Sequence, residues 1–290
     1  GIRDRSPSRG LGDVYKRQKG DAFFGLADVK SDNRAQLESC AKCHARRSTV
    51  DLDHHAGDKF TDHFLLELLE PWAARVGSPT YHPDGQIDEE VYVTGSYVQS
   101  KMFHKGVKCV DCHDPHTART LATGNALCMR CHIPKPENPT LYDSPSHHHH
   151  PVGTKGSQCV ECHMPEKNYM VVDPRRDHSI RVPRPDLSVK LGTPNACNRC
   201  HDDKGAQWAA DWVAKWHGPE RARDVRHAET FAAARKGEPE VEKRLLAVVS
   251  DTESPAFTRA SALLALRPYQ DSRGFFAAIR ALQDLSLIHI

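Results

Sequence analysis

The most constraining feature of the sequence is the pattern Cys-x-x-Cys-His, which occurs five times between residues 40 and 201. Residues at positions i, i+3 and i+4 lie on one face of a helical turn, so the two thiols and the imidazole of each copy point the same way. Two sulfurs and one nitrogen in this arrangement match a porphyrin, whose two vinyl groups bond the sulfurs while its iron binds the imidazole. The pattern is the attachment signature of c-type haem.

The five copies predict five haem c groups and use every cysteine of the chain. The predicted thioether cysteines are Cys40, Cys43, Cys109, Cys112, Cys128, Cys131, Cys159, Cys162, Cys197 and Cys200, and the predicted proximal iron ligands are His44, His113, His132, His163 and His201. Zinc knuckles also contain Cys-x-x-Cys pairs, but a four-cysteine zinc site needs no histidine after each pair. A disulfide framework needs none either. Five complete copies therefore favour haem over both alternatives.

The two ends of the chain are related at the level of DNA. Residues 13–18 can be encoded by six codons whose reverse complement encodes residues 285–290. This relation is typical of a sequencing-library adapter that has been read through as protein, and such scars are excluded from fold reasoning. We therefore expect residues 1–18 and 285–290 to be adapter-derived, and residues 19–284 to be an internal piece of a longer protein without its signal peptide.

The charge of the chain gives no support to a nucleic-acid partner. The formal net charge is +2, and residues 1–18 carry five basic and two acidic side chains, so without them the charge is −1. Nucleic-acid-binding proteins carry a basic patch, and haem propionates would add further negative charge here. No apolar run approaches the roughly 20 residues of a membrane-spanning helix, so we expect no membrane span in this fragment.

Proline-rich loops between the motifs predict a mainly α fold with much irregular structure, in which a short helix forms at each motif. We assign residues 19–204 to a haem domain. From residue 205 the composition changes, and apolar residues recur at helical spacing over 208–216, 241–249 and 257–266. The turn at 251–255 between the last two is typical of a HEAT-like or TPR-like α-helical repeat, so we assign 205–284 to a truncated region of this kind. An ordinary helical cap on the haem domain is the alternative.

The motifs give the chain a resemblance to the multihaem cytochrome c family, which includes penta- and octahaem nitrite reductases and hydroxylamine oxidoreductases. The resemblance is carried by the five motifs, by Gly106-Val107-Lys108 leading into CVDCHDPH at 109–116, by the CHMP ending at 162–165 and by Asp177-His178-Ser179. It implies a multihaem cytochrome c domain. One departure is clear: the pentahaem nitrite reductases have lysine as the proximal ligand of the catalytic haem, whereas all five motifs here have histidine.

The surplus of histidines predicts that most irons have two histidine ligands. Of 19 histidines, five are proximal and one lies in the expected adapter segment, which leaves thirteen. Each haem iron has a second axial position, which electron-transfer haems commonly fill. The candidate distal ligands are His116, His178, His150, His148, His82 and His63.

These observations predict electron transfer through five covalently bound haems. The alternative is part of a multihaem oxidoreductase that acts on a small nitrogen or sulfur oxyanion, with its catalytic haem in the missing N-terminal part; the catalytic residues are then unknown. Because bacteria attach c-type haem outside the cytoplasm, we expect a periplasmic or other extracytoplasmic protein. Expected partners are redox proteins or quinol-linked donors, and a protein that docks on the helical region.

Overall fold

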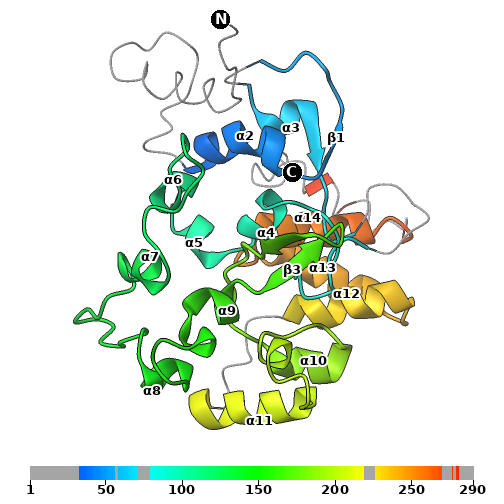
Figure 1. The fold of residues 1–290 in the computed structure, drawn as a ribbon. Helices are drawn as coiled ribbons and strands as arrows, with labels where there is room; N and C mark the ends of the chain where they lie inside the picture. Colours follow the sequence, from blue (N-terminus) through cyan, green and yellow to red (C-terminus); the bar gives the residue numbers. More distant parts are fainter. Residues whose placement is uncertain are drawn as a thin grey trace, which may run out of the picture.

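The computed structural model describes residues 33–55, 58–70, 79–218, 226–269, 276, 279 and 280. The ends that the sequence analysis assigns to an adapter, 1–18 and 285–290, lie outside these residues. The described part is mainly helical, with two small sheets and long irregular connections, which confirms the predicted fold class (Figure 1). Among the described residues, no helix has the length and apolarity needed to cross a membrane.

Most helices are short. The helices are α2 (Asn33–His44), α3 (Phe60–His63), α4 (Thr94–Tyr97), α5 (Lys101–His104), α6 (Cys109–Cys112), α7 (Asn125–Met129), α8 (Pro145–His148), α9 (Cys159–His163), α10 (Pro185–Leu191), α11 (Ala206–His217), α12 (Arg226–Lys236), α13 (Val241–Ser250) and α14 (Ala256–Ala265). Two 3₁₀ turns complete the set, η1 (Lys155–Ser157) and η2 (Cys197–Arg199). The longer helices stand at the two ends of the chain, and the short ones carry most of the motifs.

Both sheets are antiparallel pairs of short strands. β1 (Arg47–Thr49) pairs with β2 (Phe64–Leu66), so that the chain folds back onto the segment that follows the first motif. β3 (Glu166–Tyr169) pairs with β4 (Asp173–Arg176) directly after the fourth motif. The second hairpin therefore brings the chain back toward α9, so that the segment after Arg176 starts beside the fourth motif.

The hydrophobic core combines two distant parts of the sequence. Side chains between residues 41 and 91, such as Leu69 and Tyr81, pack in one buried cluster with Phe231, Leu245 and Phe257 of the C-terminal helices. Figure 1 shows the same association, with α12, α13 and α14 beside the segments that precede α4. The core thus includes residues from both sides of the predicted boundary at 204.

Polar contacts hold the two parts of this core together. The Arg235 side chain of α12 binds the Glu70 carboxylate at 2.8 Å and donates hydrogen bonds to the backbone oxygens of Leu69 and Tyr81, each at 2.9 Å. The hydroxyl of Ser261 in α14 accepts a hydrogen bond from the Leu69 backbone at 3.1 Å. These contacts satisfy buried backbone groups that would otherwise cost free energy on folding.

The C-terminal helices form where the periodicity predicts them. α11, α13 and α14 cover the three predicted segments, and Asp251 accepts hydrogen bonds from Ser254 and the Glu253 backbone in the turn between α13 and α14. α13 packs on α14 and α12, whereas α11 packs chiefly on α10 of the haem region. The HEAT-like or TPR-like repeat architecture stays a prediction. The packing of α11 on α10 is what we would expect if the helical region is an ordinary cap on the haem domain.

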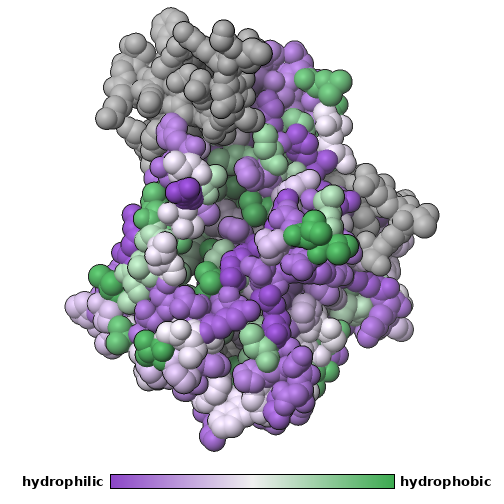
Figure 2. Space-filling view, viewed as in Figure 1, coloured by the Kyte–Doolittle hydropathy of each residue, from purple (hydrophilic) through white to green (hydrophobic). Residues whose placement is uncertain are grey.

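The segment between α5 and α9 has little apolar packing. We call residues 105–165 the motif strip, because they carry the second, third and fourth motifs along one side of the molecule (Figure 1). Every side chain from residue 130 to 141 is exposed. Figure 2 shows a mostly hydrophilic surface on this face, with hydrophobic residues scattered singly or in small groups.

Candidate functional site

Each motif forms a single helical turn that brings its two cysteines and its histidine to one side. The first motif ends α2, the second lies in α6, the fourth makes α9, and the third and fifth begin in α7 and η2. The backbone N–H of His113, His132 and His201 bonds to the first cysteine of its own motif at 2.9–3.0 Å. This is the i to i+4 closure that presents three side chains on one face, as the sequence predicts.

Two contacts between cysteines join neighbouring motifs. The thiols of Cys40 and Cys109 hydrogen-bond to each other, which lowers the pKa of Cys40 and raises the pKa of Cys109. The thiols of Cys128 and Cys159 make the same contact, which lowers the pKa of Cys128 to about 7. The first motif therefore lies against the second, and the third against the fourth.

The remaining neighbours are also close enough to influence each other. Burial raises the pKa of Cys112, and the nearby Cys128 and Cys131 of the third motif raise it further. Burial raises the pKa of Cys162 to about 11, with a smaller contribution from Cys197 of the fifth motif. All five motifs thus follow one another in space in the order of the sequence.

Three motif histidines face a second imidazole at a similar distance. The ring centroids of His113 and His178 are 6.4 Å apart, those of His163 and His147 are 6.2 Å apart, and those of His201 and His150 are 6.2 Å apart. An imidazole nitrogen binds a metal ion at about 2 Å and its ring centroid lies about 1 Å further out, so two axial imidazoles have centroids about 6 Å apart. In centroid separation, the three pairs match two imidazoles that bind one metal ion.

In three of these rings, Nδ1 is hydrogen-bonded to a backbone carbonyl, so Nε2 is the nitrogen left to bind a metal ion. Nδ1 of His163 and Nδ1 of His178 each bond to a backbone carbonyl at 2.9 Å, and Nδ1 of His150 bonds to the His148 carbonyl at 2.5 Å. A carbonyl accepts, so Nδ1 carries the proton and Nε2 keeps its lone pair. This is the usual environment of a histidine that binds a metal through Nε2.

Burial favours the neutral, ligating form of one pair. It lowers the pKa of His113 and is the largest cause of the lowered pKa of His178. A metal ion binds neutral imidazole, so a ring that resists protonation binds it over a wider range of pH. The residues present therefore fit an iron held between His113 and His178.

The other predicted distal ligands lie in different surroundings. His82 contacts the Asp88 carboxylate at 3.3 Å, and His63 contacts Asp51 at 3.3 Å. The His116 side chain is exposed, and its backbone N–H bonds to an aspartate two residues earlier. Nδ1 of His148 accepts a hydrogen bond from the backbone of His150 at 3.2 Å, and its Nε2 is buried without a hydrogen-bond partner among the described residues.

The first and third motif histidines have other neighbours. The His132 ring meets Tyr142 edge-on at a centroid distance of 5.8 Å. His44 is exposed and lies near enough to His113 to lower its pKa. Close to the first motif, both ring nitrogens of His54 are buried without a hydrogen-bond partner among the described residues, and burial followed by the charge of Lys42 lowers its pKa.

The sequence analysis did not select several residues that the structure places near the motifs. It chose His148 and not His147 from the run of four histidines, and it did not select His54. It placed tryptophans at helical spacing without a role, yet Trp208 lies 4.9 Å from the ring of His201 and Trp216 stacks on His149 at 4.1 Å. The sequence held no signal that separates His147 from His148, because both lie in the same helical turn.

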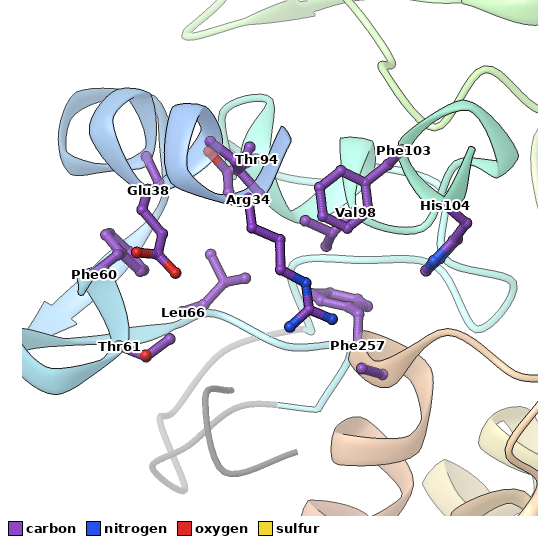
Figure 3. A pocket seen from close by; sticks show the side chains of 13 residues that line it. Arg34, Glu38, Phe60, Thr61, Leu66, Thr94, Val98, Phe103, His104 and Phe257 are labelled. Carbon is purple, nitrogen blue, oxygen red and sulfur yellow. The ribbon is translucent and has the colours of Figure 1, made fainter. Parts of the chain in front are cut away.

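One cavity lies beside α2 and includes neither the cysteines nor the histidine of the first motif. Its lining includes Arg34, Glu38, Phe60, His104 and Phe257, and Figure 3 shows these side chains between α2 and the start of α14. Of the first motif, Ala41 lines it, whereas Cys40, Cys43 and His44 do not. This cavity is therefore separate from the proposed attachment site of the first haem.

The cysteines form no disulfide bonds, and the motifs do not surround a common ion. All ten cysteines are unpaired by disulfides. Among the described residues, no three His, Cys, Asp or Glu side chains are grouped to hold a metal ion. The four converging ligands of a zinc knuckle are therefore not found in that part of the chain.

Comparison with known proteins supports haem attachment. Residues 101–137, which contain the second and third motifs, match the family described as Doubled CXXCH motif. No curated protein matches the chain. The solved structure titled "Crystal Structure of Outer Cell Wall Cytochrome OcwA" is similar, with 15% sequence identity, a TM-score of 0.45, and coverage of 97% of this chain and 68% of that one.

Proposed function

We propose that the chain is an extracytoplasmic electron-transfer protein that binds five c-type haems through its five motifs. The observation that carries the proposal is the spatial order of the motifs, in which each lies next to the one that follows it in the sequence. Haem iron accepts and releases single electrons. A continuous series of attachment sites supports passage of electrons along the chain.

The facing imidazoles support assignments of the sixth ligands. We assign His178 to the iron bound by His113, His147 to the iron bound by His163, and His150 to the iron bound by His201. Each pair has the centroid separation of two axial imidazoles. His54 is our candidate for the first motif, because its buried ring nitrogens have no hydrogen-bond partner in the described part and lie near Lys42.

A second candidate function is an oxidoreductase acting on a small nitrogen or sulfur oxyanion. The surroundings of His132 favour it, because the ring next to this exposed proximal histidine belongs to Tyr142 and not to another histidine. Catalysis at a metal requires a coordination position that the substrate can occupy. The third motif is where this chain would offer such a position.

The chemistry of attachment supports the proposed location and partners. Thioether bonds to haem are made outside the cytoplasm in bacteria, so we propose a periplasmic or other extracytoplasmic protein whose partners are redox proteins or quinol-linked donors. The helical region from residue 205 is proposed as a cap on the haem sites that also offers a surface to a protein partner.

Expression of the chain behind a periplasmic export signal, in a host with c-type haem maturation, tests the proposal. The intact mass should exceed that of the apoprotein by five haems, one for each motif. A mass with no retained haem would sink the proposal, and bound zinc in its place would restore the zinc alternative.

Ligand variants test the assignments one iron at a time. His178→Ala, His147→Ala and His150→Ala should each keep all covalent haem and convert one haem from low-spin to high-spin, measured by electron paramagnetic resonance. His82→Ala is the matched control, because this ring contacts the Asp88 carboxylate. Unchanged spectra of the first three variants would overturn the assignments.

The oxidised wild-type protein separates the two functions. Five low-spin haems and no turnover of nitrite, hydroxylamine or tetrathionate with a dye partner support electron transfer alone. A high-spin haem that disappears on adding one of these substrates, together with turnover that Tyr142→Leu changes, would support the oxidoreductase.

A further inference from the structure

The four consecutive histidines of residues 147–150 occupy four different environments. His147 faces His163 of the fourth motif, and His150 faces His201 of the fifth, each at 6.2 Å between ring centroids. We infer that this one turn supplies the sixth ligand to two neighbouring irons, and that His149 is a positioning residue that sets the direction of both ligands. The inference rests on the proposed function.

The backbone of His149 separates the two ligands. α8 ends at His148, and His149 has φ 56° and ψ 28°, the left-handed conformation. A left-handed residue at the end of a helix reverses the local direction of the chain. His150 therefore leaves the helix axis on a different course from His147, which is what two separate irons require.

A stacking contact holds His149 in this conformation. Its ring lies on Trp216 with centroids 4.1 Å apart and planes within 12°. Trp216 belongs to α11, which follows the fifth motif, so the stack ties the histidine turn to that part of the molecule. Residues other than glycine rarely adopt the left-handed region unless surrounding contacts support it.

The ring of His150 is fixed from two further sides. Its Nδ1 bonds to the His148 carbonyl at 2.5 Å, and its backbone N–H donates to Nδ1 of His148 at 3.2 Å. A Cβ atom on Gly156 would lie only 2.3 Å from the ring, so the ring occupies the space that glycine leaves. His148 therefore supports its neighbour through its carbonyl and Nδ1, while its own Nε2 is buried without a hydrogen-bond partner among the described residues.

His217 is the rival ligand. Its ring lies 5.9 Å from the ring of His147 and 5.9 Å from that of His149, so it approaches the same place from α11. We favour His147, because it faces a motif histidine at the separation of two axial imidazoles, with the planes within 8°.

The experiment counts high-spin haems in the haem-loaded full chain by electron paramagnetic resonance, against total haem from the pyridine haemochrome assay. His147→Ala and His150→Ala should each produce one high-spin haem. His149→Val should produce two, because a β-branched residue does not adopt the left-handed conformation. His149→Gly should produce none, because glycine adopts it freely. Thr154→Val is the matched control, since it places valine at φ −85° in the same loop, and should also produce none.

Each contrary result has a distinct meaning. One high-spin haem or none in His149→Val overturns the positioning role, and a high-spin haem in His217→Ala but not in His147→Ala overturns the ligand assignment. If His149→Val yields no haem-loaded protein, Trp216→Leu decides, because loss of the stack must then disturb two haems and not one. Absence of covalent haem from the wild-type chain contradicts the proposed function itself.

Discussion

The motif strip and the packed helices α12–α14 differ in how much apolar side chain they bury. Phe231, Val241 and Leu245 have no exposed surface, whereas every residue from 130 to 141 is exposed. Burial of a large apolar side chain stabilises a fold by about 1.5–3 kcal/mol, so α12–α14 can hold their place by packing. The strip has few such contacts and needs another source of order.

Within the strip, polar contacts join elements that apolar packing does not. The Asn125 side chain at the start of α7 donates to Asp143 at 2.7 Å and to the Ser157 backbone at 2.9 Å, and it accepts from the Cys159 backbone at 2.9 Å. Hydrogen bonds of this kind contribute only about 0.5–1.5 kcal/mol each. Under the proposed function, bound haem is the apolar partner that orders the strip, whereas the core is ordered by its own side chains.

Withholding haem should produce the largest difference between the motif strip and α12–α14. When the chain is made without c-type maturation, we expect the amides of residues 105–165 to exchange hydrogen almost freely, whereas those of α12–α14 keep their protection, because only the strip loses its buried apolar partner. Hydrogen exchange with mass spectrometry measures both regions in one sample. Equal protection of the strip with and without haem would contradict the dependence.

Phe231→Ala should have the largest effect among single substitutions. Removal of this fully buried ring should lower the free energy of unfolding by about 3–5 kcal/mol, while the number of covalent haems stays the same. Urea unfolding followed by far-UV circular dichroism measures the change. Val152→Ala, an apolar truncation at an exposed position of the strip, is the matched control and should cost less than about 0.5 kcal/mol.

Arg235→Met should cost less, because its ion pair is only partly buried. The substitution leaves the Glu70 carboxylate and two backbone oxygens without their donor, and we expect a loss of about 2–3 kcal/mol. The same urea assay applies. Lys190→Met removes an exposed ion pair with Glu229 and should change stability by less than about 1 kcal/mol; equal effects of the two variants would show that Arg235 does not join the core.

The smallest effect is a dependence of stability on pH at His227. Burial, followed by the charge of Arg181, lowers the pKa of His227 from 6.5 to about 4. Between these two values the unfolded chain binds a proton that the folded chain does not, so stability is lost as pH falls from about 6.5 toward 4. His227→Gln removes this titration.

The test compares the two proteins at pH 7.5 and pH 5.0. Wild type should lose about 1–2 kcal/mol more free energy of unfolding than His227→Gln over this interval. Because the His227 side chain is partly exposed, solvent reduces the free energy that corresponds to its lowered pKa. Thermal unfolding measures the difference, and other groups that titrate cancel between the two proteins. An identical loss in both would mean that His227 does not titrate in this way.

The sequence alone determined the local part of the site. The spacing of cysteine and histidine within each motif depends only on the geometry of one helical turn, and all five motifs form that turn. The periodicity of apolar residues predicted α11, α13 and α14 for the same reason. His178 and His150 were selected from the sequence, and their distances from His113 and His201 support the selection.

Only the tertiary structure decided between adjacent histidines and between distant partners. His147 and His148 lie side by side in α8, but folding brings the ring of His147 to 6.2 Å from that of His163 and stacks His149 on Trp216, which lies 67 residues later in the chain. The core likewise depends on contacts between residues 41–91 and helices that begin at residue 226. Spacing within one turn is a short-range property of the backbone, whereas the stack and the core exist only after the chain has brought remote segments together.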